Sequence, residues 1–513
     1  MRAVYRHAGC GLVVCCAAIG IVIAGCSKAG SPRNAPPASA MPPRTFELAG
    51  FLASRPTPVD SPAVADLLAA RDLSSRFELP PPPPTTLFVP PDGFRVAAVA
   101  PRGDRIALLR ELDPDTTEVL LHDRARGETR LLLPLDRDGR FLPQRFSADG
   151  KRLYLFTDEG GDTLQLEILD PDTGERSRRA RPGCEALRLD VSPDGNVDAL
   201  QWSCRGAVES ALFDSTTGEE LGPLPLPQGT RPARALPAGR SGGVLYEAAS
   251  ARLPRDLLFA DRLAADAEAR PLTFGLAPAL AAGDLVDPIP VELRVAGASS
   301  VAPIPAELWW PRRTGAAPPA LIWLENDVLP PTWMEFHPFL QFLANRGVAV
   351  VRLRLRGSLG FGKRFRHAAD GRLVDAGLED LDAARAELAL RGADPARIAV
   401  LGEGPWSGGL AAAALVERPG RFVAVAALGG DSDPLRMHDE LPALVEPARS
   451  WWLTRLGDPA TEVVRRDRAR MRLLADPTRS PLFRSDDPAA NADSTAAIAA
   501  LWGFLSTHLA VPP

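Results

Sequence analysis

Few side chains in this sequence could do chemistry, and a hydroxyl is the first candidate. Ser407 lies in a glycine-rich stretch, Gly402 to Gly409, between a short apolar run and a predicted helix. A serine hydroxyl becomes a nucleophile when an imidazole accepts its proton, so a histidine would have to meet it in the fold. The six histidines are scattered and form no cluster with cysteines or carboxylates. The sequence therefore predicts no metal, and the absence of a phosphate loop predicts no nucleotide cofactor.

The amino-terminal residues predict export and lipidation. Basic residues precede an apolar run from Leu12 to Gly25, which is the layout of a secretory signal. This run is 14 residues long, whereas a spanning helix needs roughly 20; a plain transmembrane anchor is the alternative. The run ends at Cys26 in a sequence that resembles the lipobox of bacterial lipoproteins, where the cysteine carries the lipid. We expect residues 1–26 to be a lipoprotein signal. Ser27 fits sorting to the outer membrane, facing the periplasm.

Export changes how the remaining cysteines are interpreted. Cys184 and Cys204 stay in the mature chain, in an oxidising compartment. They lie symmetrically about Asp194, in the centre of a turn sequence, so a hairpin centred there would place them opposite each other on neighbouring strands. We predict a disulfide between them. The alternative is two separately buried free thiols.

The mature chain divides by composition into three parts. Residues 27–86 are rich in proline and alanine and are interpreted as a tether, with a short helix starting at Ser61 and a proline run at 80–84.

Residues 87–286 contain a repeat. Turns at Gly127, Gly174 and Gly218 are spaced by 47 and then 44 residues, with room for four short strands between them.

A period of this length is typical of a propeller blade. We expect a β-propeller of four to five blades over 87–286, with closure of the ring left open; a generic antiparallel sandwich is the alternative. From residue 287 to 513, apolar strand-like runs alternate with amphipathic helical ones, as in the runs 320–324, 348–353 and 398–401. This alternation predicts a parallel sheet with helices on its faces.

Motifs in the last part resemble one family. Arg356-Gly357-Ser358-Leu359-Gly360-Phe361-Gly362, then Glu379-Asp380-Leu381-Asp382, then residues 392–398, then Gly429-Gly430-Asp431 follow the order and spacing seen in prolyl oligopeptidase-family serine peptidases. The resemblance covers about 287–513 and implies an α/β-hydrolase domain, here with a shortened sheet, after a propeller. The chemistry it implies is acyl transfer by a Ser-His-Asp triad beside an oxyanion hole.

The catalytic positions of the family hold other residues here. The nucleophile position falls on Gly404 when counted from the preceding strand, and on Pro405 when counted back from the next helix. Ser407 comes two or three residues late, so it is either the N-cap of the helix or a displaced nucleophile. Where the family has a His-Gly-Gly-Pro oxyanion motif, this chain has Glu325, Asn326 and Asp327. Carboxylates there would repel a developing oxyanion.

The family's other triad members also lack counterparts. The family places its Asp after a seventh strand and its His after an eighth, but residues 462–474 are interpreted as charged helix. His438, after the sixth strand, is the one histidine that could reach the site, and a solvated loop position is the alternative. The resemblance thus leaves open whether this chain is an enzyme.

Two functions follow from these observations. The first is a catalytically inactive scaffold that binds a peptide or an envelope protein. The binding surface would be the propeller, the space between the domains, or tryptophans such as Trp309 and Trp451. Packing between the domains explains these tryptophans equally well. The second is an active serine hydrolase with a rearranged site that uses Ser407. A formal charge of −5 without a basic cluster excludes nucleic acid. The partners expected are the membrane, through the lipid, and a peptide or protein.

Overall fold

A computed structural model describes the chain from residue 46 to residue 512 with gaps. The gaps are 55–56, 59–87, 114, 136–138, 193, 205–206, 222–223, 228, 238–242, 263–266, 297–302, 313–316, 326–334, 404, 429–470 and 475–487. Cys26, Asn326, Asp327, Gly404, His438 and Trp451 lie outside the described residues, as does the helix expected at Ser61. Within the described part, no helix is both long and apolar enough to cross a membrane.

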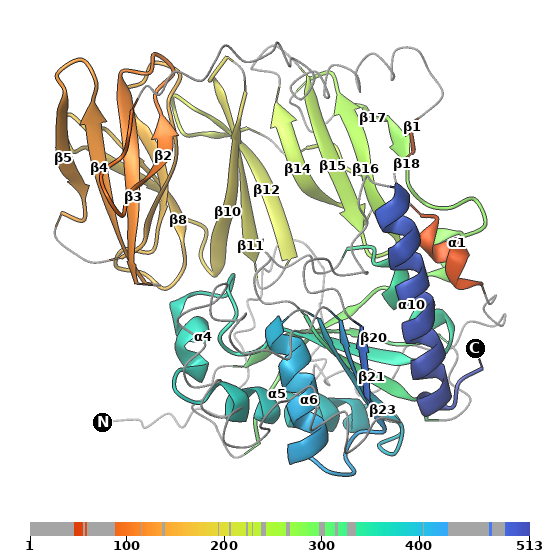
Figure 1. The fold of residues 1–513 in the computed structure, drawn as a ribbon. Helices are drawn as coiled ribbons and strands as arrows, with labels where there is room; N and C mark the ends of the chain where they lie inside the picture. The colour runs from red at the N-terminus through yellow and green to blue at the C-terminus, as the bar shows by residue number, and fades with distance from the viewer. Residues whose placement is uncertain are drawn as a thin grey trace, which may run out of the picture. The chain divides into compact units, whose positions relative to one another are not determined.

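Four antiparallel sheets of four strands each follow one another along the chain from residue 95 to 271, as blades of a propeller (Figure 1). The first has β2 (Arg95–Val99), β3 (Arg105–Asp113), β4 (Thr116–Asp123) and β5 (Glu128–Leu133); the second has β6 (Phe141–Phe146), β7 (Leu153–Thr157), β8 (Gln165–Leu169) and β9 (Arg176–Arg179). The third has β10 (Cys184–Val191), β11 (Val197–Cys204), β12 (Ala207–Asp214) and β13 (Glu220–Leu221); the fourth has β14 (Arg231–Pro237), β15 (Val244–Ser250), β16 (Leu253–Ala260) and β17 (Ala269–Pro271).

The repeated turns explain why each blade folds in the same way. In the third blade, the Ser192 hydroxyl donates to Asp194 at 2.5 Å, and the same hydroxyl oxygen accepts the Val197 amide at 2.9 Å. Gly195 closes this turn with a φ of +72°, a conformation that favours glycine. A side chain there would also meet the Ala148 methyl group of the second blade, because a Cβ would lie 2.6 Å away. The turn therefore fixes both the hairpin and the spacing of two blades.

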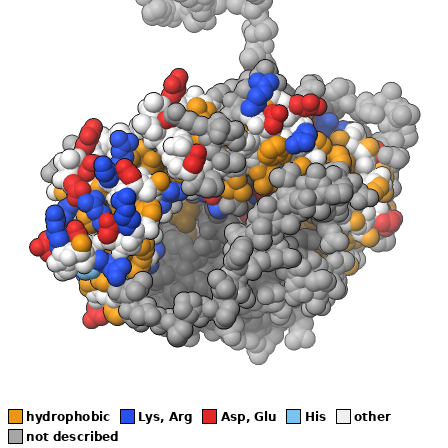
Figure 2. All heavy atoms as spheres, turned by 90° about the horizontal axis from the view of Figure 1, so that it is seen from above, with side chains coloured by type: hydrophobic (Ala, Val, Ile, Leu, Met, Phe, Trp, Pro, Cys, Tyr) orange, Lys and Arg blue, Asp and Glu red, His pale blue; other side chains and the backbone are white. Residues whose placement is uncertain are grey.

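Apolar cores form between consecutive blades. One contains Leu109 and Phe146, the next Phe156 and Trp202, and the third contains Leu212 with other residues of the third and fourth blades. Among the described residues, no such core joins the fourth blade to the first. On the face seen in Figure 2, acidic and basic side chains are interspersed over the described surface.

The second half is built on one seven-stranded sheet with the order β19-β20-β22-β21-β23-β24-β25. Its strands are β19 (Ile289–Leu293), β20 (Ile304–Trp309), β21 (Ala320–Leu324), β22 (Ala349–Leu353), β23 (Ile398–Glu403), β24 (Ala424–Leu428) and β25 (Met471–Leu474). The pairings from β22 to β25 are parallel, and those of β19 and β20 are antiparallel. This is the α/β-hydrolase arrangement that the sequence predicted.

Helices cover both faces of this sheet. The helices α5 (Leu373–Leu390) and α6 (Pro405–Glu417) pack on one face, and α3 (Pro338–Asn345) and α10 (Pro488–Leu509) on the other. The second layer also contains α1 (Leu48–Leu52), whose Phe51 lies 5.8 Å from the Phe342 ring of α3. Short helical turns are α4 (Lys363–Arg366), η1 (Ala282–Asp284) and η2 (His367–Ala369).

Two sequence predictions are wrong here. Residues 46–54 belong to the folded part rather than the tether, because Phe51 and Leu52 are buried against α3; β1 (Thr57–Pro58) also pairs with β18 (Thr273–Phe274). Residues 471–474 form the parallel strand β25 rather than the end of a charged helix. The apolar run of β25 is four residues long with arginines inside and around it, and this composition hid the strand.

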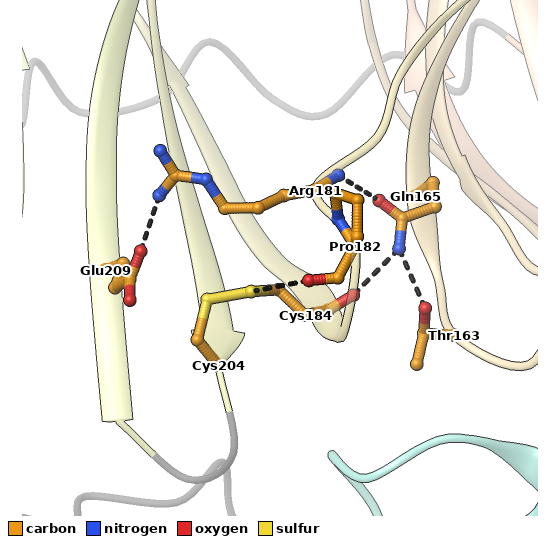
Figure 3. Close-up of a disulfide and its surroundings, with 7 residues drawn as sticks. All are labelled: Thr163, Gln165, Arg181, Pro182, Cys184, Cys204 and Glu209. Carbon is orange, nitrogen blue, oxygen red and sulfur yellow. Dashed lines mark hydrogen bonds and ion pairs between the residues drawn. A yellow bond between two sulfur atoms is a disulfide. The ribbon is translucent and has the colours of Figure 1, made fainter. Parts of the chain in front are cut away.

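The structure joins Cys184 and Cys204 in a disulfide. The two residues are directly opposite in the register of β10 and β11, with Cα atoms 4.2 Å apart. Figure 3 shows Gln165 beside the bridge, where its side-chain amide donates to the Cys184 carbonyl at 2.8 Å. The bridge thus joins the first two strands of the third blade, and the Gln165 bond ties this corner to the second blade.

Replacing both Cys184 and Cys204 by serine should destabilise the propeller. The bridge closes a segment with a sequence separation of 20, and a cross-link over such a loop is worth about 3 kcal/mol. We expect the urea midpoint of the variant to fall to that of the wild-type protein unfolded in a reductant. Equal midpoints for the variant and the oxidised wild type would contradict this.

Candidate functional site

The strand-to-helix corner at the end of β23 is tight. The strand ends at Glu403 and α6 begins at Pro405, so a single residue separates the two elements. A Cβ on Gly402 would lie only 2.0 Å from the Ser407 carbonyl oxygen, so the helix backbone packs directly on the strand. The chain therefore keeps the sharp corner on which a hydrolase nucleophile is normally presented. At that corner, the candidate position Gly404 lies outside the described residues, and Pro405 is the first residue of α6.

Ser407 does not have the position expected of an N-cap or of an exposed nucleophile. It is the third residue of α6, because the helix starts earlier, at Pro405; the N-cap interpretation is therefore wrong. Its side chain is 1% exposed, and its hydroxyl donates to the backbone carbonyl of Glu325 at 2.8 Å. This bond ties α6 to the loop after β21, which is where the family has its oxyanion motif.

The described histidines are engaged elsewhere. His337 caps α3 through Nδ1 at 3.3 Å from the Leu340 nitrogen, and burial together with the nearby Arg352 charge lowers the pKa of its imidazole to about 3. His367 lies between Asp370 and Asp115 of the first blade, with 2.6 Å to each carboxylate. His122 bonds Thr129 at 2.8 Å, and the His508 ring packs at a tilt against the Phe504 ring, with 4.6 Å between the ring centres. None of these contacts of the four histidines involves Ser407.

A buried ion-pair network lies at the carboxyl ends of the central strands. We use this name for Glu307, Glu325, Arg352, Arg354 and Glu403, all of which are 5% exposed or less. Arg352 on β22 bonds Glu307 on β20 at 2.6 Å and lies 3.6 Å from Glu325. Arg354 approaches the other Glu325 oxygen at 3.2 Å. Glu325 was predicted from the sequence to replace an oxyanion donor, and here it holds two guanidinium groups.

The other carboxylates of the network are fixed by indole groups. Glu403, at the end of β23, accepts the Trp323 indole N–H at 3.2 Å, and Glu307 accepts that of Trp309 at 3.0 Å. Burial opposes the positive charge of Arg352, but Glu307, Glu325 and Glu403 raise the pKa of its guanidinium. The network contains three carboxylates and two guanidinium groups. Its electrostatics therefore stabilise the buried arginines and offer no excess positive charge to an oxyanion.

The loop that carries the Arg-Gly-Ser motif has a structural role. Arg356 is buried and bonds Asp380 of α5 at 2.6 Å and Glu379 at 2.9 Å. Burial raises the pKa of Asp380 to about 6, although Arg356 acts against that rise. Further along, the Gly362 amide donates to Glu185 of the third blade at 3.1 Å. The motif thus joins the sheet, its covering helix and the propeller.

A candidate for the triad aspartate was not identified from the sequence, because the strand β25 was not predicted. The family places its triad Asp after the seventh strand, and Asp476 follows β25 by two residues. Asp476 itself lies outside the described residues. The sequence signal was the short run Met471 to Leu474, which charged neighbours obscured.

Comparison with known proteins agrees with this geometry. Residues 334–469 match the model of the prolyl oligopeptidase family. The chain is 27% identical over 369 residues to dipeptidyl aminopeptidase BIII of Pseudoxanthomonas mexicana, covering 67% of this chain and 49% of the relative, so it spans about half of that protein's length.

Solved structures show the same fold. One from a study of two prolyl endopeptidases has a TM-score of 0.60 and 16% identity, covering 81% of this chain and 66% of the other. A puromycin hydrolase has a TM-score of 0.59 and 20% identity, covering 78% and 63%. At these identities the likeness concerns the fold alone. It bears out the expected propeller followed by an α/β-hydrolase domain.

Replacing Arg352 by methionine should strongly destabilise the protein. The substitution leaves Glu307 and Glu325 buried beside an apolar side chain, and breaking a buried pair in this way costs about 3–5 kcal/mol. The matched control is Arg95→Met, because the Arg95–Glu111 pair is 61% exposed on both sides and such pairs contribute about 1 kcal/mol or less. Chemical denaturation of both variants measures the difference. Equal losses in the free energy of unfolding of the two variants would show that the buried ion-pair network does not act as a stabilising unit.

Proposed function

Given that residues 334–469 belong to the prolyl oligopeptidase family, we propose that this chain is a non-catalytic relative of its serine peptidases. In this proposal it is an exported lipoprotein, held at the cell envelope by a lipid on Cys26, where it binds peptides or envelope proteins. The observation that carries the proposal is the hydrogen bond from the Ser407 hydroxyl to the Glu325 carbonyl. This bond ties the hydroxyl of the one serine at the strand-to-helix corner to the loop after β21.

The chemistry of the family needs a hydroxyl that can reach a substrate carbonyl and an imidazole that takes its proton. Ser407 is 1% exposed, so a peptide carbonyl cannot approach its oxygen without a rearrangement of α6. Its proton points to a backbone carbonyl, which is not a base. Removing a whole triad lowers the turnover number by about 10⁶, or roughly 8 kcal/mol of barrier.

The oxyanion side supports the same proposal. Hydrolases of this kind stabilise the developing negative charge with N–H donors, and the loss of one donor costs on the order of 10²–10³ in rate. Here the loop after β21 directs the Glu325 carbonyl oxygen to Ser407 and the Glu325 carboxylate to two arginines. Negative charge at this position would be repelled rather than stabilised.

What the chain keeps is suited to binding. The propeller and the α/β-hydrolase domain are joined by the Arg-Gly-Ser loop, and the disulfide braces the third blade for an oxidising compartment. A lipid on Cys26 would hold these surfaces close to a membrane, since each buried methylene contributes about 0.8 kcal/mol. An envelope scaffold uses all of these features, whereas a peptidase would need residues that the corner lacks.

A fluorophosphonate probe tests the absence of catalysis. We expect the purified mature protein to show no more labelling than its Ser407→Ala variant, because the hydroxyl is buried and has no imidazole partner among the described residues. The dipeptidyl aminopeptidase relative serves as the positive control. Labelling that disappears in Ser407→Ala would instead establish an active hydrolase with a rearranged site, with His438 and Asp476 as the first residues to replace.

Lipidation at Cys26 can be tested separately. Cells of a Gram-negative host that express the full chain should incorporate labelled palmitate into the protein and retain it in the outer-membrane fraction. Cys26→Ala should abolish the label, because the thiol is the acylation site. Retention of label in that variant would contradict the proposed anchor, whereas label in the inner-membrane fraction would contradict only the proposed sorting.

A further inference from the structure

The third blade has an outer strand that is much shorter than its neighbour. β12 runs for eight residues from Ala207 to Asp214 and pairs with β11 along its whole length. On the other side, β13 pairs only with Leu212 and Phe213. The edge of β12 from Ala207 to Ala211 is therefore not covered by β13.

The backbone pattern shows which groups this edge presents. The Asp214 amide donates to the Glu219 carbonyl at 2.9 Å, so the peptide groups of Asp214 face the β13 side. Peptide groups of an antiparallel strand alternate between its two edges, so those of Leu212, Ser210 and Val208 face the same side. In the described part of the chain, no hydrogen-bond partner is found for the outward N–H and C=O groups of Val208 and Ser210. Such groups form a template for another strand.

A cavity lies along this edge. It is open to solvent and has a volume of about 510 Å³, which is within the ordinary range of binding sites. Its lining comes from both sides of β12. Leu224, Leu226 and Pro232 line it on the side of the fourth blade, and Arg181 and Glu209 line it on the side of the second. The side chains of an added strand, which alternate between two faces, would thus meet apolar surface on one face and polar surface on the other.

Some charged side chains that line the cavity already have a partner, and others do not. Arg181 bonds Glu209 at 2.6 Å and its guanidinium lies 4.6 Å from the centre of the Trp202 ring, so this arginine is already engaged; Figure 3 shows it reaching Glu209 near the disulfide. Arg231 and Glu220 are exposed, and neither side chain has a partner among the described residues. An occupant that complements both carries one acidic and one basic side chain.

We infer that this edge of the third blade binds an extended peptide segment of a partner protein, which adds a strand to the blade beside β12. The segment alternates apolar and polar residues and carries a carboxylate for Arg231 and a cation for Glu220. The inference rests on the proposed binding role and places the binding surface on the propeller rim. Main-chain bonds to Val208 and Ser210 provide affinity, and the cavity selects side chains.

Proline at one position tests the edge specifically. Ser210→Pro removes the outward N–H without touching the β11 ladder, and proline is tolerated at a strand edge in that orientation. Ser210→Ala is the matched control, because it removes only the hydroxyl, which donates to Pro232 at 3.3 Å. Arg231→Glu tests charge selection. The probes are acetylated seven-residue peptides that alternate β-branched and polar residues, with Asp and Lys at two polar positions, and a second set with serine there.

Binding is measured by fluorescence polarisation, and hydrogen exchange of residues 207–214 reports where the peptide lies. We expect the Asp/Lys peptides to bind and to slow exchange in β12, with affinity lowered at least tenfold by Ser210→Pro and less than twofold by Ser210→Ala. Arg231→Glu should remove the preference over the serine set. Equal binding to wild type and Ser210→Pro overturns the rim site while leaving the binding role intact. No binding of either peptide set to the wild type overturns the rim site as well, whereas labelling by the fluorophosphonate probe overturns the proposed non-catalytic role alone.

Discussion

A guanidinium group in the middle of a buried sheet must be surrounded by negative charge, and this requirement shapes the site. Arg352 lies on β22 with a side chain that is 2% exposed. Removing such a charge from water costs several kcal/mol, which only well-placed carboxylates offset. Glu307, Glu325 and Glu403 supply them from three other positions at the strand ends. The carboxyl ends of the central strands thus hold buried protein charges that satisfy one another.

The family motifs that remain are those with a structural role. Arg356 is bonded to α5, and Gly362 approaches the propeller so closely that a Cβ would lie 2.6 Å from an Asp162 oxygen. Lys363 reaches Asp158 of the second blade at 3.1 Å. In the part of the chain that the structure describes, these motif residues therefore hold the α/β-hydrolase domain to its covering helix and to the propeller.

The sequence predicted the elements that repeat or are strongly apolar. The turn spacing indicated blades, and buried runs such as Val350–Leu353 indicated parallel strands, because both patterns report local backbone requirements. It failed where tertiary packing decides the outcome. The helix at Phe51 forms because α3 is there to cover it, and β25 forms because β24 offers an edge. The Ser407 bond to Glu325 joins residues 82 positions apart, and no local pattern encodes that distance.

The set of cores between blades has a consequence for how the propeller resists unfolding. Each of the three cores joins two consecutive blades, and among the described residues none joins the last to the first. A closed ring loses two interfaces when any blade detaches, whereas an open row loses only one when an end blade does. The propeller should therefore behave as a short linear array, in which stability is set by nearest neighbours and opening begins at an end. The first blade is the end with an exposed apolar flank at Val96 and Leu131, so local unfolding should start there.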